Sequence, residues 1–381
     1  MLPDVAVRLT GSRFRAGYRV SCGAAEAAAL AEALAVEQTL EFPAELLADG
    51  DIRRRVKGQV EKVDPVGENL FAVEISYADE VSGFELPQLL NVLFGNVSLL
   101  PGIRLERIDL TEALLAHFRG PRFGRAGLRR LVRAEERPLL ATALKPMGLP
   151  PAELARLAGQ FALGGIDLIK DDHGLANQPF APWRERVAAC AEAVRDANAH
   201  SDGTSLYLPS ASGPMEDLFE RVLWAKRQGA GGLLVIPGLV GWDTMRALAD
   251  SDEMGLPIMS HPAFLGGFTD DRRGVAPAVL FGALMRLAGA DAVIYPNYGG
   301  RFSFSREQCL DIADGTAAPM GRLASIFPVP SGGMTLERVP EMLGTYGHDV
   351  ILLIGGGLFS AGPSLTDTCR RFRGLVDESF A

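Results

Sequence analysis

The stretch from residue 165 to residue 173 joins a short apolar run to a group of ionisable side chains; it reads Gly-Ile-Asp-Leu-Ile-Lys-Asp-Asp-His. A short apolar run bounded by glycine is typical of a buried strand, so Lys170, Asp171 and Asp172 are predicted at its carboxyl end. Because unpaired buried charge is costly, such a cluster should pair internally, bind a metal or face a ligand. Alternation places Lys170 and Asp172 on one side of the strand and Asp171 on the other. A surface ion pair at a strand end is the simpler alternative.

Lysine is rare in this chain. The 38 basic residues include only five lysines, at positions 57, 62, 145, 170 and 226. Lys145 and Lys170 both end apolar, strand-like runs. A buried lysine amine can lose its proton and act as a base or react covalently, whereas a guanidinium cannot. We therefore expect both lysines to be catalytic.

Composition bounds the class of protein. The chain has 381 residues, of which 48% are hydrophobic and 22% charged, as in a globular protein with one large and one smaller domain. A net charge of −9 argues against nucleic-acid or anionic-membrane partners. The four cysteines are widely spaced, which is typical of a reducing compartment. We find no signal peptide and no run of the ~18 apolar residues that a membrane span needs, so the sequence predicts a cytoplasmic protein.

From about residue 138 onward, strand-like and helix-like segments alternate regularly. The strand-like runs are Pro138–Leu144, Ile166–Lys170, Ser205–Leu208, Gly232–Ile236, Pro257–Met259, Ala292–Tyr295, Ser325–Val329 and Val350–Ile354. Eight strands, each followed by a helix, predict a (β/α)8 TIM barrel of the α/β class. A doubly wound open sheet is the alternative, but no G-x-G-x-x-G follows the first strand.

The first 130 residues have a different pattern, which predicts antiparallel strands and helices. The expected strands are Asp4–Leu9, Gly17–Ser21 and Asn69–Ser76, and the expected helices are Ala24–Glu37 and Leu86–Leu93. We predict an N-terminal α+β, ferredoxin-like domain over residues 1–130 and a barrel catalytic domain over residues 131–381. The segment Phe118–Arg137, rich in arginine and glycine, is the expected connector.

Two glycine clusters follow the seventh and eighth strands. In a TIM barrel the chemistry lies at the carboxyl ends of the strands, and these clusters leave backbone N–H groups open to an anion. They predict a phosphate site, although glycines that only make turns are the alternative. The residues concerned are Ser331, Gly332, Gly333, Gly355, Gly356 and Gly357.

Other polar residues stand at strand ends. His261 follows the fifth strand and is a candidate general acid or base, with a structural histidine as the alternative. His173, beside the charge cluster, is a candidate metal ligand. Asn297 and Arg301 follow the sixth strand and are candidates for substrate binding; a solvated loop arginine is the alternative for Arg301.

These stretches together resemble the large subunit of ribulose-bisphosphate carboxylase (RuBisCO), and more closely the RuBisCO-like proteins. Ala143–Pro146 is similar to the lysine motif of the family's first barrel strand, and Gly164–Asp172 is similar to its carbamylated-lysine and metal segment. Asn177–Phe180 and Trp183–Arg186 continue this likeness. The two glycine clusters resemble the family's phosphate loops.

The resemblance implies a particular chemistry. CO2 would convert Lys170 into a carbamate that, with Asp172 and His173 in the third ligand position, holds Mg2+ beside a small phosphorylated substrate. The ion would stabilise an enediolate. Glu37 and Asn96 resemble residues that the family reaches across a dimer interface, so a homodimer or a multiple of dimers is implied.

Departures from the family pattern argue against carboxylation of a bisphosphate. His173 stands where the family has a glutamate, and Met147 where it has a lysine. No lysine follows Lys226, although the family's flexible sixth loop carries one. Pro262 replaces an arginine that binds the second phosphate.

Three functions remain. The main hypothesis is a lyase that decarboxylates or cleaves a phosphorylated 3-oxo sugar acid. Loss of CO2 from such an acid leaves the kind of enolate that this scaffold stabilises. The runner-up is a methionine-salvage enolase or isomerase acting on a methylthio-sugar phosphate. Relatives that perform the enolase step have a lysine at the position of Asn96, which counts against that step. A non-catalytic phosphate-binding protein is third, and the retained Lys145, Lys170 and His261 argue against it.

Overall fold

The computed structural model describes residues 5–302 and 304–379, which fold as two compact units. The first unit comprises the chain up to Arg119 together with Leu265–Ala283 and Pro319–Leu323. The second unit comprises Gly120–Phe264, Leu284–Ala318 and the chain from Ala324 onward.

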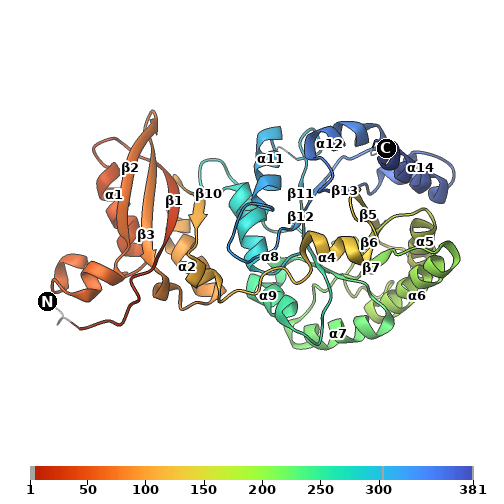
Figure 1. The fold of residues 1–381 in the computed structure, drawn as a ribbon, viewed down its shortest axis with the longest axis horizontal. Helices are drawn as coiled ribbons and strands as arrows, with labels where there is room; N and C mark the ends of the chain where they lie inside the picture. Colours follow the sequence, from red (N-terminus) through yellow and green to blue (C-terminus); the bar gives the residue numbers. More distant parts are fainter. Residues whose placement is uncertain (1–4, 303, 380–381) are drawn as a thin grey trace. The chain divides into compact units, whose positions relative to one another are not determined.

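The first unit is built on a five-stranded sheet in the order β10-β4-β1-β3-β2 (Figure 1). Neighbouring strands are antiparallel except that β10 runs parallel to β4. Alternate side chains of β1 are buried, beginning with Phe14 and Ala16, and α1 packs on β2 and β3. The elements are β1 Arg13–Ser21, α1 Ala27–Glu37, β2 Gln59–Gly67, β3 Leu70–Ala78, α2 Leu86–Phe94, β4 Ile103–Asp109, α3 Glu112–Leu115 and β10 Gly274–Val275.

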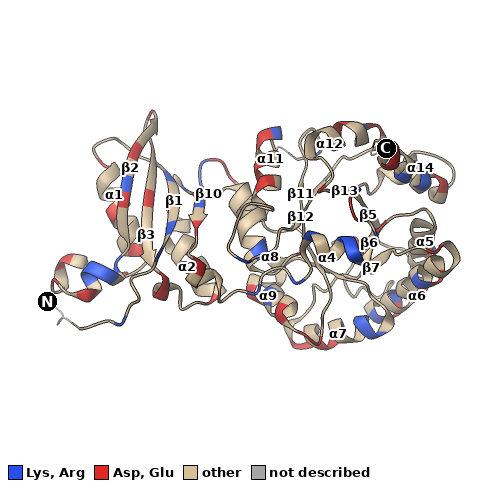
Figure 2. Cartoon of the chain, viewed as in Figure 1, with Lys and Arg blue, Asp and Glu red and all other residues tan. Residues whose placement is uncertain are grey.

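The second unit is the (β/α)8 barrel that the sequence predicts, and Figure 1 shows its helices around the strands. Its strands are β5 Leu139–Leu144, β6 Leu168–Asp171, β7 Leu206–Leu208, β8 Leu233–Val235, β9 Ile258–Ser260, β11 Ala292–Pro296, β12 Phe327–Ser331 and β13 Ile351–Leu353. Its helices are α4 Gly124–Leu131, α5 Pro151–Leu163, α6 Trp183–Ser201, α7 Met215–Gln228, α8 Pro237–Val240, α9 Trp242–Asp250, α10 Met285–Leu287, α11 Arg306–Gly315, α12 Val339–Tyr346, α13 Gly357–Ser360 and α14 Leu365–Glu378. Outer helices such as α6 and α7 carry charges of both signs (Figure 2).

The barrel strands pair as two parallel four-stranded arrays, β13-β5-β6-β7 and β12-β11-β9-β8. The bridge between Ser210 and Leu234 links β7 to β8, and β12 packs beside β13, so the eight strands follow one another around a ring.

Alternation along these strands decides which side chains enter the barrel. Leu139, Ala141 and Leu168 belong to the apolar cluster that all eight strands share, whereas Leu140 and Ile169 pack in the layer between strands and helices. Lys170 therefore follows Leu168 into the barrel, and Asp171 follows Ile169 toward the helices, as the sequence predicts.

Some expectations fail. The strand predicted over Asp4–Leu9 is absent from its described part, residues 5–9, and Asp4 lies outside the described residues. Strands β2, β4 and β10 were not predicted. The expected connector contains α4, where the N–H groups of Phe123 and Gly124 donate to Asp291 Oδ1, each at 2.7 Å. Within the described part of the chain, no helix is long and apolar enough to cross a membrane.

Candidate active site

Five side chains predicted from the sequence lie at the carboxyl ends of β5, β6 and β9; we call Lys145, Lys170, Asp172, His173 and His261 the mouth cluster. Lys145 Nζ lies 2.9 Å from Asp172 Oδ1, and His173 Nδ1 lies 3.4 Å from the same oxygen. The rings of His173 and His261 stack with centroids 4.5 Å apart and planes inclined by 13°. Residues from three strands thus meet in one place, as a barrel active site requires.

Lys170 supplies the buried amine of the cluster. Only 2% of the residue is exposed, and Nζ donates a hydrogen bond to the backbone oxygen of Asp171 at 3.0 Å. Burial lowers the pKa of Lys170 to about 8; Asp172 opposes this shift and the charge of Lys145 adds to it. A sizeable fraction of the amine is therefore neutral in mildly alkaline solution, as a base or a CO2 acceptor must be.

Asp172 is the anionic centre of the cluster. Burial would raise its pKa, but hydrogen bonds from His173 and Lys145 and the charge of Lys170 hold the pKa well below the usual range. The carboxylate is therefore ionised at any working pH.

His261 is held neutral with a defined tautomer. Burial, reinforced by the charges of Lys170 and His173, lowers the pKa of His261 to about 2. Its Nδ1 accepts a hydrogen bond from the backbone N–H of Ala263 at 3.1 Å, so the ring proton resides on Nε2. The imidazole can therefore donate a hydrogen bond to a substrate oxygen without carrying a charge.

A buried network behind Lys170 was missed by sequence reasoning. Asp171 is fully buried and accepts hydrogen bonds from Arg186 Nε and Nη2 at 3.3 and 3.2 Å, from Tyr207 at 2.8 Å and from the backbone N–H of Ser210 at 2.9 Å. Arg186 is buried as well. Alternation gave the direction of Asp171, but its partners are distant in sequence. The network fixes the backbone from which Lys170 projects.

The loops that contain the two glycine clusters, which we call the glycine loops, include backbone conformations that are unfavourable for other residues. Gly332 and Gly333 have φ values of +89° and +91°, a region that favours glycine. A Cβ on Gly300 would lie 1.8 Å from the backbone oxygen of Gly332, so the loop after β11 packs closely on the loop after β12. At the end of β13, a Cβ on Gly355 would lie 3.6 Å from Lys145 Cε. The last glycine cluster is therefore beside the mouth cluster.

The remaining predicted residues of the barrel differ in accessibility. Asn297 is fully buried; its amide donates to the sulfurs of Met334 and Met342 and accepts from Tyr346 at 2.6 Å. That amide is occupied by the protein and supports the glycine loops from behind. Arg301 is exposed and lies 5.5 Å from the ring of Phe302.

Ser331 shares the position of the glycines at the end of β12. Its hydroxyl donates to the backbone oxygen of Tyr295 at 3.3 Å, and its own backbone oxygen accepts from the N–H of Asn297 at 2.8 Å. These bonds join the ends of β11 and β12 under the glycine loops. Gly356 and Gly357 follow β13 at the start of α13.

Glu37 and Asn96 belong to the first unit and contact each other. Asn96 Nδ2 donates to Glu37 Oε1 at 2.9 Å. The adjacent Gln38 is buried and donates to the backbone oxygens of Asn91 and Val92, which fixes the end of α1 against α2. The two residues that the resemblance assigns to a shared site are thus one hydrogen-bonded pair.

The described residues contain no group of three or more histidine, cysteine, aspartate or glutamate side chains that could hold a metal ion. Asp172 and His173 could supply two ligands to such an ion. The donor set therefore suits a divalent cation only if Lys170 has become a carbamate, which adds an oxygen donor.

Comparisons with known proteins identify the family. A family model described as the ribulose bisphosphate carboxylase large chain, catalytic domain, matches residues 125–364. The chain is 44% identical to the 5-methylthioribulose-1-phosphate isomerase of Rhodospirillum rubrum, over 94% of this chain and 95% of the relative. It is 34% identical to the 2,3-diketo-5-methylthiopentyl-1-phosphate enolase of Geobacillus thermodenitrificans, over 86% and 83% of the two chains.

Solved structures resemble it over nearly the whole length. The Rubisco-like protein from Rhodopseudomonas palustris has a TM-score of 0.88 and 42% identity, over 96% of this chain and 98% of that chain. The dimeric archaeal Rubisco from Hyperthermus butylicus shares the fold, with a TM-score of 0.87 and 24% identity over 99% and 92%. The chain therefore belongs to the RuBisCO large-chain family, and within it to the RuBisCO-like proteins.

Proposed function

We propose that the chain is an isomerase that moves a carbonyl group between neighbouring carbons of a methylthio-pentulose phosphate. The observation that carries the proposal is Lys170, a buried amine whose lowered pKa suits proton transfer, in one cluster with neutral His261. The name of the R. rubrum relative supports the substrate class. Decarboxylation, expected first from the sequence, has less support, because one relative is named an isomerase and the other an enolase.

Each residue has a defined task in this reaction. Neutral Lys170 takes a proton from the carbon next to the substrate carbonyl, and the electron pair moves onto the carbonyl oxygen as an enediolate. His261 Nε2–H donates a hydrogen bond to that oxygen. The proton of the neighbouring hydroxyl then passes to the enediolate oxygen, which becomes a hydroxyl. The Lys170 ammonium returns its proton to the former carbonyl carbon as the neighbouring C–O becomes the new carbonyl. No other reactant is consumed.

The glycine loops and Lys145 bind the phosphate in this proposal. Backbone N–H groups after β12 and β13 hold the ester, and Lys145, which contacts Asp172 and passes beside Gly355, adds a positive charge. Isomerisation is favoured over the enolase step because relatives that perform that step have a lysine where this chain has Asn96, here bonded to Glu37.

Proteins of this family typically bind Mg2+. With Lys170 carbamylated, one carbamate oxygen, Asp172 and His173 would hold the ion, and the other carbamate oxygen would take the substrate proton in place of the amine. When bound, the ion would polarise the substrate carbonyl. We further propose a homodimer in which Glu37 and Asn96 reach the partner subunit's site.

The test is incubation of the protein with 5-methylthioribulose 1-phosphate in D2O, with bicarbonate and a divalent cation, followed by proton and phosphorus NMR. We expect an isomeric ketose phosphate that has gained deuterium at one carbon, and no reaction with Lys170→Met. Release of CO2 from a 3-oxo sugar-acid phosphate, without isomerisation, would instead establish the lyase. If neither product is formed and no deuterium is taken up, proton-transfer chemistry on these substrates is rejected.

A further inference from the structure

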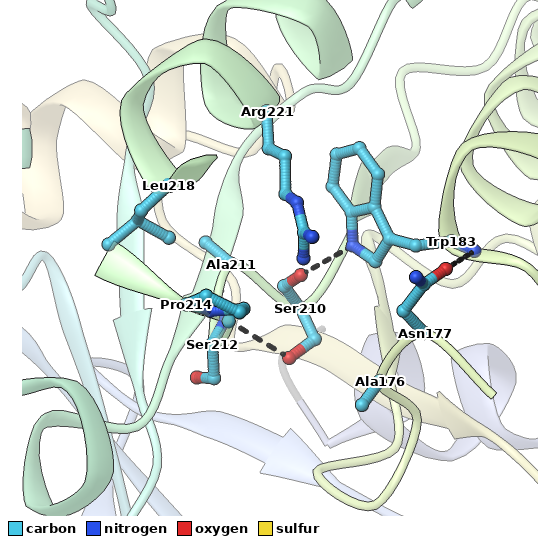
Figure 3. A pocket seen from close by; sticks show the side chains of 10 residues that line it. Ala176, Asn177, Trp183, Ser210, Ala211, Ser212, Pro214, Leu218 and Arg221 are labelled. Atoms are coloured by element: carbon cyan, nitrogen blue, oxygen red, sulfur yellow. Dashed lines mark hydrogen bonds between the residues drawn. The ribbon is translucent and has the colours of Figure 1, made fainter. Parts of the chain in front are cut away.

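A cavity lies between the start of α7 and the loops that follow β6 and β7 (Figure 3). The glycine loops follow other strands, β12 and β13. Its volume is about 190 Å³. The side chains that determine its chemistry are Asn177, Trp183, Ser212, Leu218 and Arg221.

Hydrogen-bond donors outnumber acceptors in this cavity. Arg221 Nη2 donates a hydrogen bond to Asp217 Oδ2 at 2.9 Å. Among the described residues, no acceptor lies within hydrogen-bond distance of Arg221 Nε or Nη1. Asn177 Oδ1 accepts from the backbone N–H of Trp183 at 2.8 Å, which leaves its amide N–H groups. Ser212 Oγ accepts from the N–H of Ile236 at 3.1 Å, which leaves its proton.

None of the ten residues that line the cavity is acidic. Asp217 is half-exposed, contacts only Nη2 of the guanidinium and is not among the residues that line the cavity. Excess donors around a cation favour an oxyanion with several acceptor atoms.

Apolar side chains also line the cavity, and Figure 3 shows the indole of Trp183 beside Arg221. The indole of Trp183, whose Nε1 donates to the backbone oxygen of Ser210 at 2.8 Å, lies with Ala211, Pro214 and Leu218 around the same space. An inorganic anion would leave this surface uncovered, whereas a carboxylate with a short carbon chain would cover it.

We propose that this cavity binds a short-chain carboxylate of about two to four carbons. The carboxylate group lies against Arg221 and Asn177, and the carbon chain against Trp183 and Leu218. Because the N–H of Ser210 also holds Asp171 at 2.9 Å, the ligand adjoins the network behind Lys170.

Isothermal titration of the full chain with butyrate, acetate and sulfate tests the proposal. We expect butyrate to bind most tightly and Arg221→Met to weaken its binding about tenfold or more. Gly213→Ala should weaken it too, because the added Cβ would lie 2.7 Å from Arg221 Nη1. Arg227→Met, an exposed change on the same helix, is the matched control and should bind like wild type.

Circular dichroism and melting temperature confirm that the variants are folded. The proposal is overturned if butyrate does not bind, if folded Arg221→Met binds it as wild type does, or if sulfate binds more tightly than butyrate. These results are independent of the isomerase assay, since the variants leave the mouth cluster and glycine loops intact.

Discussion

The ammonium of Lys145 lies 2.9 Å from the carboxylate of Asp172. The same side chain passes beside Gly355, where a Cβ would lie 3.6 Å from Lys145 Cε. One flexible cation therefore connects the anionic centre of the site to a loop that we assign to the phosphate. A substrate phosphate that attracts Lys145 would release part of the Asp172 carboxylate for other contacts.

Lys145→Met should reduce kcat/KM for the phosphorylated substrate by about a hundredfold, because it removes a positioned charge from the site. The isomerase assay measures this loss. Lys226→Met is the control; its ammonium donates to the backbone oxygen of Glu253 on an exposed surface, and activity should persist. Unchanged activity of Lys145→Met would remove this residue from the reaction.

Activity or its activation by CO2 should rise with pH through an apparent pKa near 8, because only neutral Lys170 accepts a proton or CO2. The pH profile of the initial rate measures this. Lys170→Arg should be inactive at every pH, since a guanidinium does neither. A wild-type initial rate that stays constant from about pH 7 to about pH 9 would contradict the assignment of Lys170 as the titrating group.

The same group makes stability depend on pH. In the unfolded chain Lys170 has a pKa of about 10.4. Between pH 8 and that value the unfolded state binds more protons, so the contribution of Lys170 to the free energy of unfolding rises with pH and is lost as pH falls through about 8. Urea unfolding at several pH values should show this rise in wild type relative to Lys170→Met, and equal slopes would refute it.

Gly356→Ala should raise KM for the phosphorylated substrate about tenfold without unfolding the protein. No atom lies within 4 Å of the added Cβ, and the φ of −55° suits alanine, so any effect comes from the space left for a ligand. Gly374→Ala in α14 is equally open and serves as the control. Identical KM values for both variants and wild type would place the phosphate elsewhere.

Arg186→Met should destabilise the chain by about 3–5 kcal/mol, because it leaves the carboxylate of Asp171 buried without its cation. Arg184→Met, two residues away, breaks an exposed pair with Glu220 and a cation–π contact with Trp224, and should cost about 1 kcal/mol. Urea denaturation of both variants gives the comparison. If both variants lose a similar free energy of unfolding, the burial of the Asp171–Arg186 pair does not determine its contribution to stability.

The barrel was predictable because each strand is a short apolar run with a helix after it. β5 begins one residue later than predicted and ends where predicted, and β6 begins two residues later and ends one residue later. β2 was not predictable, since it is largely exposed, contains Pro65 and shifts register against β3. β10 has two residues and is a strand only because it pairs with β4, far away in the sequence.

The same distinction applies to the site. Strand alternation fixed the directions of Lys170 and Asp171, because a period of two leaves no choice. The stack of His173 on His261 and the bonds from Tyr207 to Asp171 depend on side-chain packing across different strands. Such contacts between distant positions leave no local pattern in the sequence.

The pairing of β10 with β4 has a practical consequence for anyone dividing this gene. The strand that completes the first unit's sheet is encoded in the middle of the barrel, at Gly274–Val275. A polypeptide ending at Arg119 would lack it, and one side of β4 would present unpaired N–H and C=O groups. Such open edges recruit other chains, so this fragment should aggregate when expressed, unless a peptide spanning residues 265–283 is supplied with it.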